Sequence, residues 1–571
     1  MVSRLTQSFS FHSSPESFIS ARLGESTRSD GDALPLASRI VRAQILNREV
    51  HIVTSYHVCK AILCHQPGAI ESVEEASLGR FDASKYDSEY AHVYAQGRTS
   101  ISRGGVSPQR SRKCTVHAKN RGRSDDKANF FAARTAYRQF MGDFFPGSNL
   151  LLEDGLAHKI HKAKWRTRLD HLPQSSVSLI RQITESRFLD QLVRGRNPQE
   201  VDLYASLKSL VWDILFGVFL SISRDGNGRK FKQLEELQEA LLRGQFSTFP
   251  VSISTPLWSS TRSRGLQAVE ELEKSLATIA RDVLASNGTS RSFNACPFSE
   301  QFRGTSLSSD DYLDTEDIVS HLRLFTSSIA NKALASLLTA FILNLFVWRP
   351  SSSMTNTDEQ GSDTSVSLAE LIRSYSDPQK RDVMLNAVLA ETERLSPPVV
   401  GVMRRVQQDV LISSADRDQP DEYEIPEGQD AWLYLSGANR DPDVYDRAGD
   451  FVWDRFLPFY SSSSNDATRA NADCLGTDFR PPLPFTFGDG VKSCLGAEFS
   501  RQVCLTVAKT LVDESIMMTG RIEEGGVISW LGWERRTSRK DEVQLMARDL
   551  KQLPTQRPRR AIKVQIGRLN M

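Results

Sequence analysis

Hydrophobic positions recur at helical spacing over most of the chain that follows residue 129. The pattern predicts helices over Leu203 to Phe219, Phe231 to Leu242, Leu266 to Ala285, Thr315 to Trp348, Leu368 to Tyr375 and Pro378 to Leu395. Before that point, the alternating run IVRAQILNREVHIVTS predicts two strands, and a helix follows from Tyr56 to about Cys64. The chain is therefore predicted to be mainly α-helical, with a small β-rich region.

The helix predicted over Thr315 to Trp348 is the longest. Asp314 or Thr315 can cap its N-terminus, and Pro350 ends it, so at 1.5 Å per residue it would extend for roughly 50 Å. Its second half, Ala333 to Trp348, is the most apolar stretch of the chain. This stretch is shorter than the run of about 18 residues that a membrane span needs, so we expect a buried helix.

The polar stretches suggest one large domain rather than several. We expect a polar N-terminal segment at 1–32 and a single domain over 33–571, with a polar insertion at 96–129. The insertion is basic and rich in Ser and Gly and shows no helical or strand period, so we expect it to be disordered or poorly packed. It lacks the interleaved aromatic residues that stack on bases, which argues against nucleic-acid binding.

Charge and cysteine content narrow the possible partners and location. The formal net charge of 571 residues is +1, so no global field recruits nucleic acid or an acidic membrane. Seven scattered cysteines include no C-x-x-C pair, which fits an intracellular protein without a zinc or redox cysteine motif. The N-terminal sequence has neither a signal peptide nor a membrane anchor pattern, so we expect a cytoplasmic or peripherally membrane-associated protein.

The segment PFTFGDGVKSCLGAEFSR, at 484–501, places one cysteine between a Gly-rich loop and a predicted helix. Backbone N–H groups at such a position stabilise an anion, so Cys494 should favour the thiolate form that binds metals. Gly488 and Gly490 permit backbone conformations that other residues disfavour, and Gly496 lets the helix approach a flat partner closely. A buried structural cysteine and a nucleotide-binding loop are the alternatives, although the latter lacks the third glycine and the preceding strand.

This segment resembles the haem-binding signature of the cytochrome P450 superfamily. The matching positions are Phe487, Gly488, Gly490, Lys492, Cys494 and Gly496. The resemblance implies the cytochrome P450 fold, with a long central helix over haem b and with Cys494 as the axial ligand of the iron. The family usually has arginine where Lys492 stands, and lysine can still meet a haem propionate as a point charge.

A second motif upstream supports the resemblance. Glu391 and Arg394 lie one turn apart in DVMLNAVLAETERLSPP, a spacing that by itself predicts only an exposed salt bridge. In the family, an E-x-x-R helix precedes the cysteine loop and joins an arginine from a later segment in a buried network. Arg455 in FVWDRFLP matches that arginine, and the intervening GANRDP is very similar to a common phrase of the family.

The resemblance also implies contacts at the haem edge. Arg404 stands where the family often places a propionate-binding arginine. His158 and Lys162 match the H-x-x-x-R pattern of the helix that packs on the opposite haem edge. An ordinary basic helix face is the alternative interpretation of His158, His161 and Lys162.

In the family, a thiolate ligand on the haem iron favours cleavage of dioxygen. The resemblance therefore implies a monomeric monooxygenase that oxidises a small organic substrate, which we expect to belong to secondary metabolism. It would use O2 and electrons from a separate NADPH-dependent reductase, because the chain shows no obvious flavin or nicotinamide domain.

The predicted long helix departs from the family pattern. Members commonly have an acid and a threonine that relay protons, whereas this chain has Ala330 and Asn331 there. Asn331, Ser327 and Ser328 are the candidate catalytic residues, and the alternative is that Asn331 only binds backbone. The departure motivates two rival hypotheses: an isomerase or lyase that rearranges a hydroperoxide or endoperoxide without O2, and a non-catalytic haem sensor.

Overall fold

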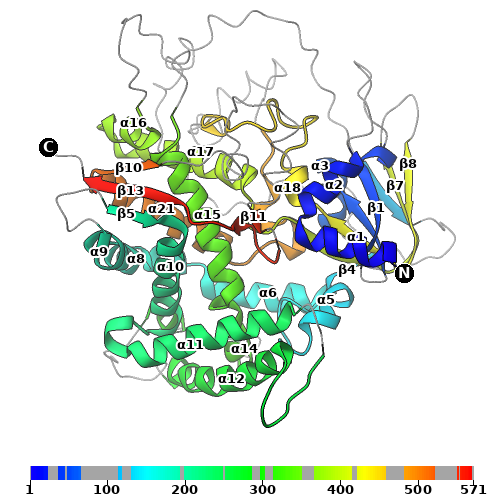
Figure 1. Cartoon of the computed structure of the whole chain (residues 1–571), viewed down its shortest axis with the longest axis horizontal. Helices are drawn as coiled ribbons and strands as arrows, with labels where there is room; N and C mark the ends of the chain where they lie inside the picture. Colours follow the sequence, from blue (N-terminus) through cyan, green and yellow to red (C-terminus); the bar gives the residue numbers. More distant parts are fainter. Residues whose placement is uncertain are drawn as a thin grey trace, which may run out of the picture.

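The computed structural model describes most of the chain in a series of ranges. These are residues 2–23, 36–45, 48–65, 114–118, 130–192, 199–247, 251–285, 296–302, 313–349, 366–414, 421–457, 481–520, 550–551 and 553–568. In Figure 1 a β-rich part lies at one side of the molecule, and helices make up most of the rest.

The largest sheet combines strands from the beginning and the middle of the chain. Its order is β1 (Ile40–Ile45), β2 (Arg48–Val53), β9 (Asp430–Leu433), β6 (Val402–Val406) and β4 (Phe131–Ala132). The β1–β2 pair is the early hairpin that alternation predicted. β2 and β9 pair in parallel, with Val50 opposite Asp430, so the N-terminal hairpin is fixed to a strand from the second half of the chain.

A second sheet corrects the prediction for the insertion at 96–129. Within that range, β3 (Cys114–Ala118) pairs antiparallel with β7 (Val410–Ser414), which in turn pairs with β8 (Glu422–Ile425). The prediction of an insertion without strand structure was wrong for these five residues, because the alternation in CTVHA is too short to stand out among polar neighbours. The remainder of 96–129 lies outside the described residues.

The described part of the polar N-terminal segment packs on the large sheet. It forms α1 (Val2–Ser13) and α2 (Pro15–Leu23), whose apolar side chains Phe11, Phe18 and Ile19 are buried. The rings of Phe11 and Trp432 meet edge to face with centroids 4.9 Å apart. Residues 2–23 therefore extend the core around the sheet.

The helical part contains most of the predicted helices. The longer helices that follow the N-terminal hairpin are α3 (Tyr56–Leu63), α5 (Ala133–Met141), α6 (Gly155–Leu169), α10 (Leu203–Leu220), α11 (Arg224–Gln245), α12 (Thr261–Ala285), α14 (Thr315–Phe325), α15 (Ser328–Phe346), α16 (Leu368–Ser374), α17 (Pro378–Leu395) and α21 (Ala497–Asp513). Short helices are α7 (Leu172–Ser175), α8 (Val177–Ile183), α9 (Asp190–Leu192), α13 (Pro297–Glu300) and α18 (Leu435–Ala438). A small sheet joins β5 (Gln199–Asp202), β13 (Lys563–Arg568) and β10 (Ile516–Gly520), and β11 (Leu550–Lys551) pairs with β12 (Arg557–Pro558).

The helix predicted over Thr315 to Trp348 is broken into α14 and α15. The side chain of Ser327 caps α15 by accepting from the backbone N–H of Ala330 at 3.2 Å, and Thr326 lies between the two helices. The hydroxyl of Thr326 accepts from the Gln238 side chain at 3.2 Å. The prediction of one continuous helix was wrong because side-chain hydroxyls here compete with the backbone for hydrogen bonds.

Two helical stretches are long and apolar enough to cross a membrane, Leu203–Leu220 and Thr315–Phe346. Buried residues make up 67% and 78% of their apolar windows, however, which is typical of core helices. α15 follows this description, since it crosses the middle of the molecule in Figure 1 and every residue from Leu334 to Phe346 is buried. These stretches are weak evidence for a membrane span.

Candidate haem-thiolate site

The cysteine loop, at 484–496, leads directly into α21, and its Thr486 hydroxyl donates to the Glu393 carbonyl of α17. Its backbone turns through two short 3₁₀ segments, Phe485–Phe487 and Gly490–Lys492, before Cys494, whose N–H donates to the Phe487 carbonyl at 2.8 Å. Gly488 and Gly490 have φ of +71° and +63°, in the region that favours glycine. A Cβ on Gly490 would lie 2.3 Å from the carbonyl oxygen of Leu63, so this glycine also allows the loop to approach α3 closely.

The side chain of Cys494 lies inside the protein and yet has free surface. The residue is exposed, although the protein atoms around it raise the pKa of its thiol. Both observations fit a side chain that faces an open space within the protein. The Gly496 N–H, Lys162 and Arg501 lower the pKa, but burial outweighs them. The backbone N–H of Gly496 thus favours the thiolate, as expected of this loop, and a bound metal ion would add to that stabilisation.

Four of the predicted cofactor-binding side chains come together beside this loop. Burial, together with the positive charges of Lys492, Lys162 and Arg404, lowers the pKa of His158 to about 3. Burial also lowers the pKa of Lys162 to about 8 and shifts the pKa of Lys492 downward. The four side chains thus form a buried cluster with an excess of positive charge.

Two lysines of this cluster hold the loop to α6. Lys162 donates to the carbonyl oxygens of Val491 and Ser493 at 2.9 and 2.6 Å and to the Ser493 hydroxyl at 2.9 Å. Lys492 forms an ion pair with Asp154 at 3.3 Å and a hydrogen bond to the Glu153 carbonyl. Both amino groups therefore have protein partners, while the buried Arg404 donates to the Met403 carbonyl beside it at 2.9 Å.

The structure brings Glu391, Arg394 and Arg455 together in one buried network. Arg394 donates to both carboxylate oxygens of Glu391 at 2.8 Å, and Arg455 donates to the same carboxylate at 3.1 and 3.2 Å. Arg394 also donates to the carbonyls of Asn439, Ala448 and Asp450. The pair is thus fully buried, unlike the exposed salt bridge that its spacing alone would predict, and it fixes the segments that precede the cysteine loop.

Sequence reasoning missed a second ion pair behind the loop. Arg501 donates twice to the Glu393 carboxylate, each time at 2.9 Å, and its guanidinium lies 4.9 Å from the ring centroid of Phe487. The contact joins α17, α21 and the loop. Glu393 lies inside the E-x-x-R motif itself, and a second acid there was the signal available in the sequence.

Each of the three candidate catalytic residues has a hydrogen-bond partner within the protein, and those of Ser328 and Asn331 lie on neighbouring helices. Ser327 caps α15, and the Ser328 hydroxyl donates to the Glu239 carboxylate on α11 at 2.9 Å. Asn331 donates to the Lys208 carbonyl on α10 at 3.1 Å, and its side-chain oxygen is buried without a partner among the described residues.

Glu239 also binds two lysines that sequence reasoning missed. Lys332 and Lys208 lie 2.7 and 3.1 Å from its carboxylate oxygens. Burial alone would raise the pKa of Glu239, but Lys332, Lys208 and Ser328 together lower it to about 2. A lysine in the otherwise apolar α15 was the sequence signal, because a buried lysine requires an anionic partner.

The described residues around Cys494 fit a haem. A Cβ on Gly496 would meet no atom nearer than the Cys494 sulfur, at 3.9 Å, so the face of the loop beside the sulfur is open. The buried Arg404 donates to the Met403 carbonyl through one of its nitrogens, which leaves N–H groups for a haem propionate, and Lys162 and Lys492 add positive charge beside it. The site and the arrangement of helices define a haem-thiolate protein of the cytochrome P450 fold.

Comparisons with known proteins agree with this class. Residues 373–513 match the family model Cytochrome P450. The solved structure of retinoic acid bound cyanobacterial CYP120A1 superposes with a TM-score of 0.54 at 17% identity, and the match covers 93% of this chain and 92% of that one. The fold is the cytochrome P450 fold, and the region of the cysteine loop is that of the cytochrome P450 superfamily, whose members bind haem through a cysteine thiolate.

Two curated relatives show how far the sequence similarity extends. Allene oxide synthase 1 of Solanum lycopersicum is 31% identical over 108 residues, which cover 17% of this chain and 20% of that protein. Putative cytochrome P450 120 of Synechocystis sp. is 23% identical over 335 residues, or 57% of this chain and 65% of that protein. The chain thus spans from a fifth to about two thirds of the length of these relatives.

Proposed function

We propose that this chain is a haem-thiolate monooxygenase that oxidises a small organic substrate, with a separate NADPH-dependent reductase as its electron donor. The observation that carries the proposal is the open sulfur of Cys494 in a loop that Lys162, Arg501 and the Glu391 network hold in place. A thiolate-bound haem supplies the activation of dioxygen.

The residues of the chain have distinct tasks in this proposal. Cys494 would hold the haem iron through its sulfur, and the Gly496 N–H donates to that sulfur and stabilises negative charge on it. Arg404 would pair with a propionate, while Lys162 and Lys492 add positive charge nearby and His158, whose low pKa keeps it neutral, would be an uncharged hydrogen-bond partner. The Glu391 network ties α17 to the segment at 446–450 and to Asn439. The Asn439 side chain in turn accepts from the Phe485 N–H, which connects the network to the start of the loop.

The first experiment is the absorption spectrum of the purified, reduced, carbon-monoxide-bound protein. A strongly red-shifted Soret band is expected, because it reports a thiolate ligand. A Soret band at the ordinary position, or a protein that takes up no haem, would contradict the proposal. In a second step, product formation from a panel of small apolar compounds is measured with and without NADPH and a reductase, and the proposal requires dependence on both.

A second candidate function, rearrangement of an organic hydroperoxide, is favoured by α15. The acid and the threonine that relay protons in many members are replaced by Ala330 and Asn331, and Ser327 and Ser328 are engaged as a helix cap and as a partner of Glu239. In addition, the stretch that matches an allene oxide synthase is 31% identical. An asparagine amide can orient a peroxide oxygen by a hydrogen bond without acting as a proton donor in the reaction.

The two candidates differ in what they consume. Rearrangement predicts loss of an added hydroperoxide without NADPH, reductase or O2, and the Asn331→Ala variant should then be at least roughly tenfold slower, the loss of one well-aligned hydrogen bond. Thermal unfolding of the same variant shows whether the change acts only through stability. A chain that binds haem with a thiolate but converts neither type of substrate, and changes structure when a gas binds, would support a sensor instead.

A further inference from the structure

The connection between α11 and α12 carries a large share of the exposed apolar side chains. Ten large hydrophobic residues are exposed among the described ranges of the chain, and five of them lie within residues 246–258. In Figure 1 the connection projects from the ends of α11 and α12 as a green loop at the lower edge of the molecule. Single exposed apolar residues are normal, but a concentration of them marks an interaction surface. The five residues are Phe246, Val251, Ile253, Leu257 and Trp258.

Hydrogen bonds hold residues 251–260, the tip hairpin, in a defined shape. Ser254 and Ser259 form an antiparallel bridge, and their hydroxyl groups lie 3.0 Å apart. Between them, the backbone N–H of Trp258 donates to the Thr255 carbonyl at 3.3 Å and closes a four-residue turn. Proline follows Thr255, at the turn position where its fixed φ is favourable. The turn places Leu257 and Trp258, which are 98% and 58% exposed, at the tip.

The base of the tip hairpin is fixed to the start of α12. The Ser260 hydroxyl donates to the Val251 carbonyl at 2.8 Å, and the Ser263 hydroxyl donates to the Ile253 carbonyl at 3.0 Å. These bonds satisfy backbone groups that would otherwise need other partners. The hairpin therefore keeps its shape without burying its apolar side chains.

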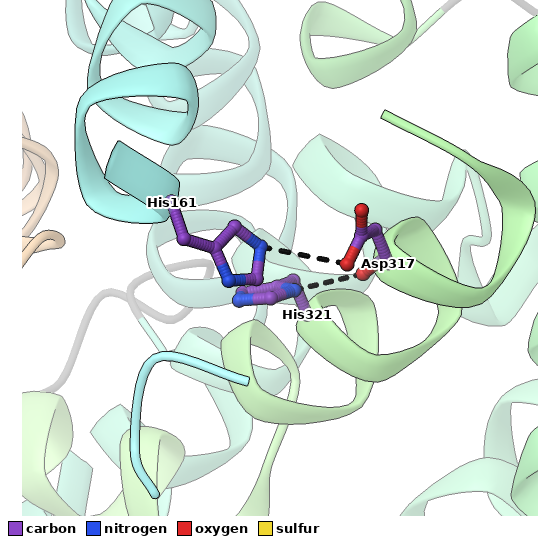
Figure 2. Close-up of side chains that lie close together, drawn as sticks. All are labelled: His161, Asp317 and His321. Atoms are coloured by element: carbon purple, nitrogen blue, oxygen red, sulfur yellow. Dashed lines mark hydrogen bonds and ion pairs between the residues drawn. The ribbon is translucent and has the colours of Figure 1, made fainter. Parts of the chain in front are cut away.

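α12 is in turn held to the body of the protein through α14. Arg323 of α14 donates to the Glu273 carboxylate of α12 at 2.6 Å. Figure 2 shows how α14 meets α6: Nε2 of His161 lies 3.5 Å from the Asp317 carboxylate, and the rings of His161 and His321 meet edge to face with centroids 4.8 Å apart. The tip hairpin is thus mounted on helices that are tied to the core, so any surface that it contacts meets the same face of the molecule.

The charge around the tip hairpin differs from that of the whole chain. The chain as a whole has 71 basic and 70 acidic residues, whereas residues 240–269 contain arginines but no aspartate or glutamate. Arg262 is paired with Asp143, and Arg243 and Arg264 are exposed. An apolar tip with exposed arginines beside it complements a surface that is apolar inside and negatively charged outside, which is the character of an anionic lipid membrane.

A lipid surface fits this feature better than a protein partner does. Stable protein interfaces bury roughly 800 Å² on each partner, from about 20–30 residues. Insertion into a membrane interface needs only a small apolar tip, and tryptophan favours that region because its ring is apolar while its N–H is polar. The tip hairpin, with Leu257 and Trp258 as its outermost side chains, meets the second requirement and falls short of the first.

We propose that the tip hairpin docks this chain on an anionic lipid membrane, with Leu257 and Trp258 inserted into the interfacial region and with Arg243 and Arg264 against acidic headgroups. The association is peripheral and reversible, because few apolar side chains insert and salt screens the electrostatic attraction. The inference goes beyond the proposed enzymatic function, since no residue of the tip hairpin belongs to the candidate haem-thiolate site.

The test is co-sedimentation of the purified full-length chain with sucrose-loaded vesicles of phosphatidylcholine, with and without phosphatidylserine. The wild-type chain should sediment with the vesicles that contain phosphatidylserine. Leu257→Ser/Trp258→Ser should bind these vesicles at least about tenfold more weakly, because the apolar surface that inserts is lost. Leu156→Ser is the matched control, since it removes an exposed leucine on α6 and should leave vesicle binding unchanged.

The arginines and salt test the electrostatic part of the proposal. Each of the substitutions Arg243→Gln and Arg264→Gln should weaken binding to the anionic vesicles about fivefold. The difference from the wild type should shrink as the ionic strength rises, because salt screens exposed charges. Thermal unfolding of every variant should give the wild-type midpoint, since all the substituted side chains are exposed, and this excludes misfolding as the cause of lost binding.

Two results would overturn the inference. One is equal binding of the wild type and of Leu257→Ser/Trp258→Ser to the anionic vesicles, and the other is a wild-type chain that binds vesicles of neither composition. In the second case, sedimentation velocity without lipid identifies the other occupant. A wild-type dimer that Leu257→Ser/Trp258→Ser does not form would assign the tip hairpin to a second copy of the chain.

Discussion

The cysteine loop and the start of α15 are both polar sites within the helical part, but they are built differently. Near the loop, carboxylates are paired with arginines through directed hydrogen bonds. Glu391 accepts from two arginines, and Glu393 accepts two hydrogen bonds from Arg501. At α15, one carboxylate, that of Glu239, is shared by Lys332, Lys208 and Ser328, and the amide oxygen of Asn331 has no described partner.

The difference teaches which site the family pattern constrains. A thiolate ligand requires one backbone path, so the loop keeps the glycines, the cysteine and the buried network that hold that path. At α15, Ala330 and Asn331 stand where the resemblance would place an acid and a threonine. We therefore expect substitutions at the loop to abolish the class of chemistry, and substitutions at α15 to change stability or the reaction.

The largest effect is expected for Cys494→Ser. The variant should lose the red-shifted band of the reduced carbon-monoxide complex entirely, because an alcohol does not replace a thiolate as iron ligand. The measurement is the difference spectrum of wild type and variant at equal protein concentration. Cys114→Ser on β3 is the matched control and should keep the band; a Cys494→Ser variant with an unchanged band would remove the loop from the site.

The next largest effect is expected for Glu391→Gln, which leaves two buried guanidinium groups without their counter-charge. We expect a loss of about 3–5 kcal/mol in the free energy of unfolding, measured in urea, since breaking one side of a buried ion pair leaves an uncompensated charge. Glu236→Gln on the exposed face of α11 removes a surface pair and should cost less than about 1 kcal/mol. Similar losses in the two variants would mean that the loop network does not stabilise the fold.

An intermediate and pH-dependent effect is expected at α15. The pKa of Glu239 is about 2 in the folded chain against an ordinary value of 4.5, so its contribution to stability is complete above about pH 4.5 and is lost as the pH falls toward 2. The stability advantage of wild type over Glu239→Gln should therefore shrink by about 3 kcal/mol between pH 5 and 2. Urea midpoints followed by circular dichroism across this range test it, and a constant advantage would show that the lysines do not hold the carboxylate ionised.

The smallest effect is expected for Lys492→Arg, which restores the residue that the family usually has. Lys492 binds Asp154 and backbone carbonyls of the segment before α6, and an arginine can reach the same acceptors. The rate at which the variant loses haem to an excess of a haem-binding protein should differ from the wild-type rate by less than about tenfold, or 1.4 kcal/mol. A larger change would show that the cluster around His158 depends on the shape of this cation.

Most of the fold was predictable where helical periodicity is strong. α10 and α17 begin and end within one residue of their predictions, because their apolar faces and their capping residues Asp202 and Asp377 agree. The break between α14 and α15 was not predicted, since hydrophobic spacing continues across Thr326 and only the hydroxyl bonds interrupt the backbone. The strand β3 was hidden for a related reason: its partner β7 lies about 300 residues away, so no local pattern reveals the pairing.

The candidate site was predictable in kind but not in its contacts. The resemblance to the family's motifs pointed to Cys494 and to the buried Glu391 network, whereas the spacing of Glu391 and Arg394 by itself predicted only an exposed salt bridge. Partners that come from distant helices, such as Glu239 for Ser328 and Asp154 for Lys492, depend on tertiary packing that a single sequence does not contain.

The parallel pairing of β2 with β9 sets a condition on the synthesis of the chain. Val50 finds its partner Asp430 only after about 380 further residues have been made. At roughly 5–20 residues per second, the early hairpin, with Ile52 and Val53 destined for burial, waits roughly 20–80 s without the strand that covers its edge. A ribosome-bound chain would therefore expose an unpaired, apolar strand edge for most of its elongation, and co-translational chaperones would have their longest opportunity to act on residues 40–53.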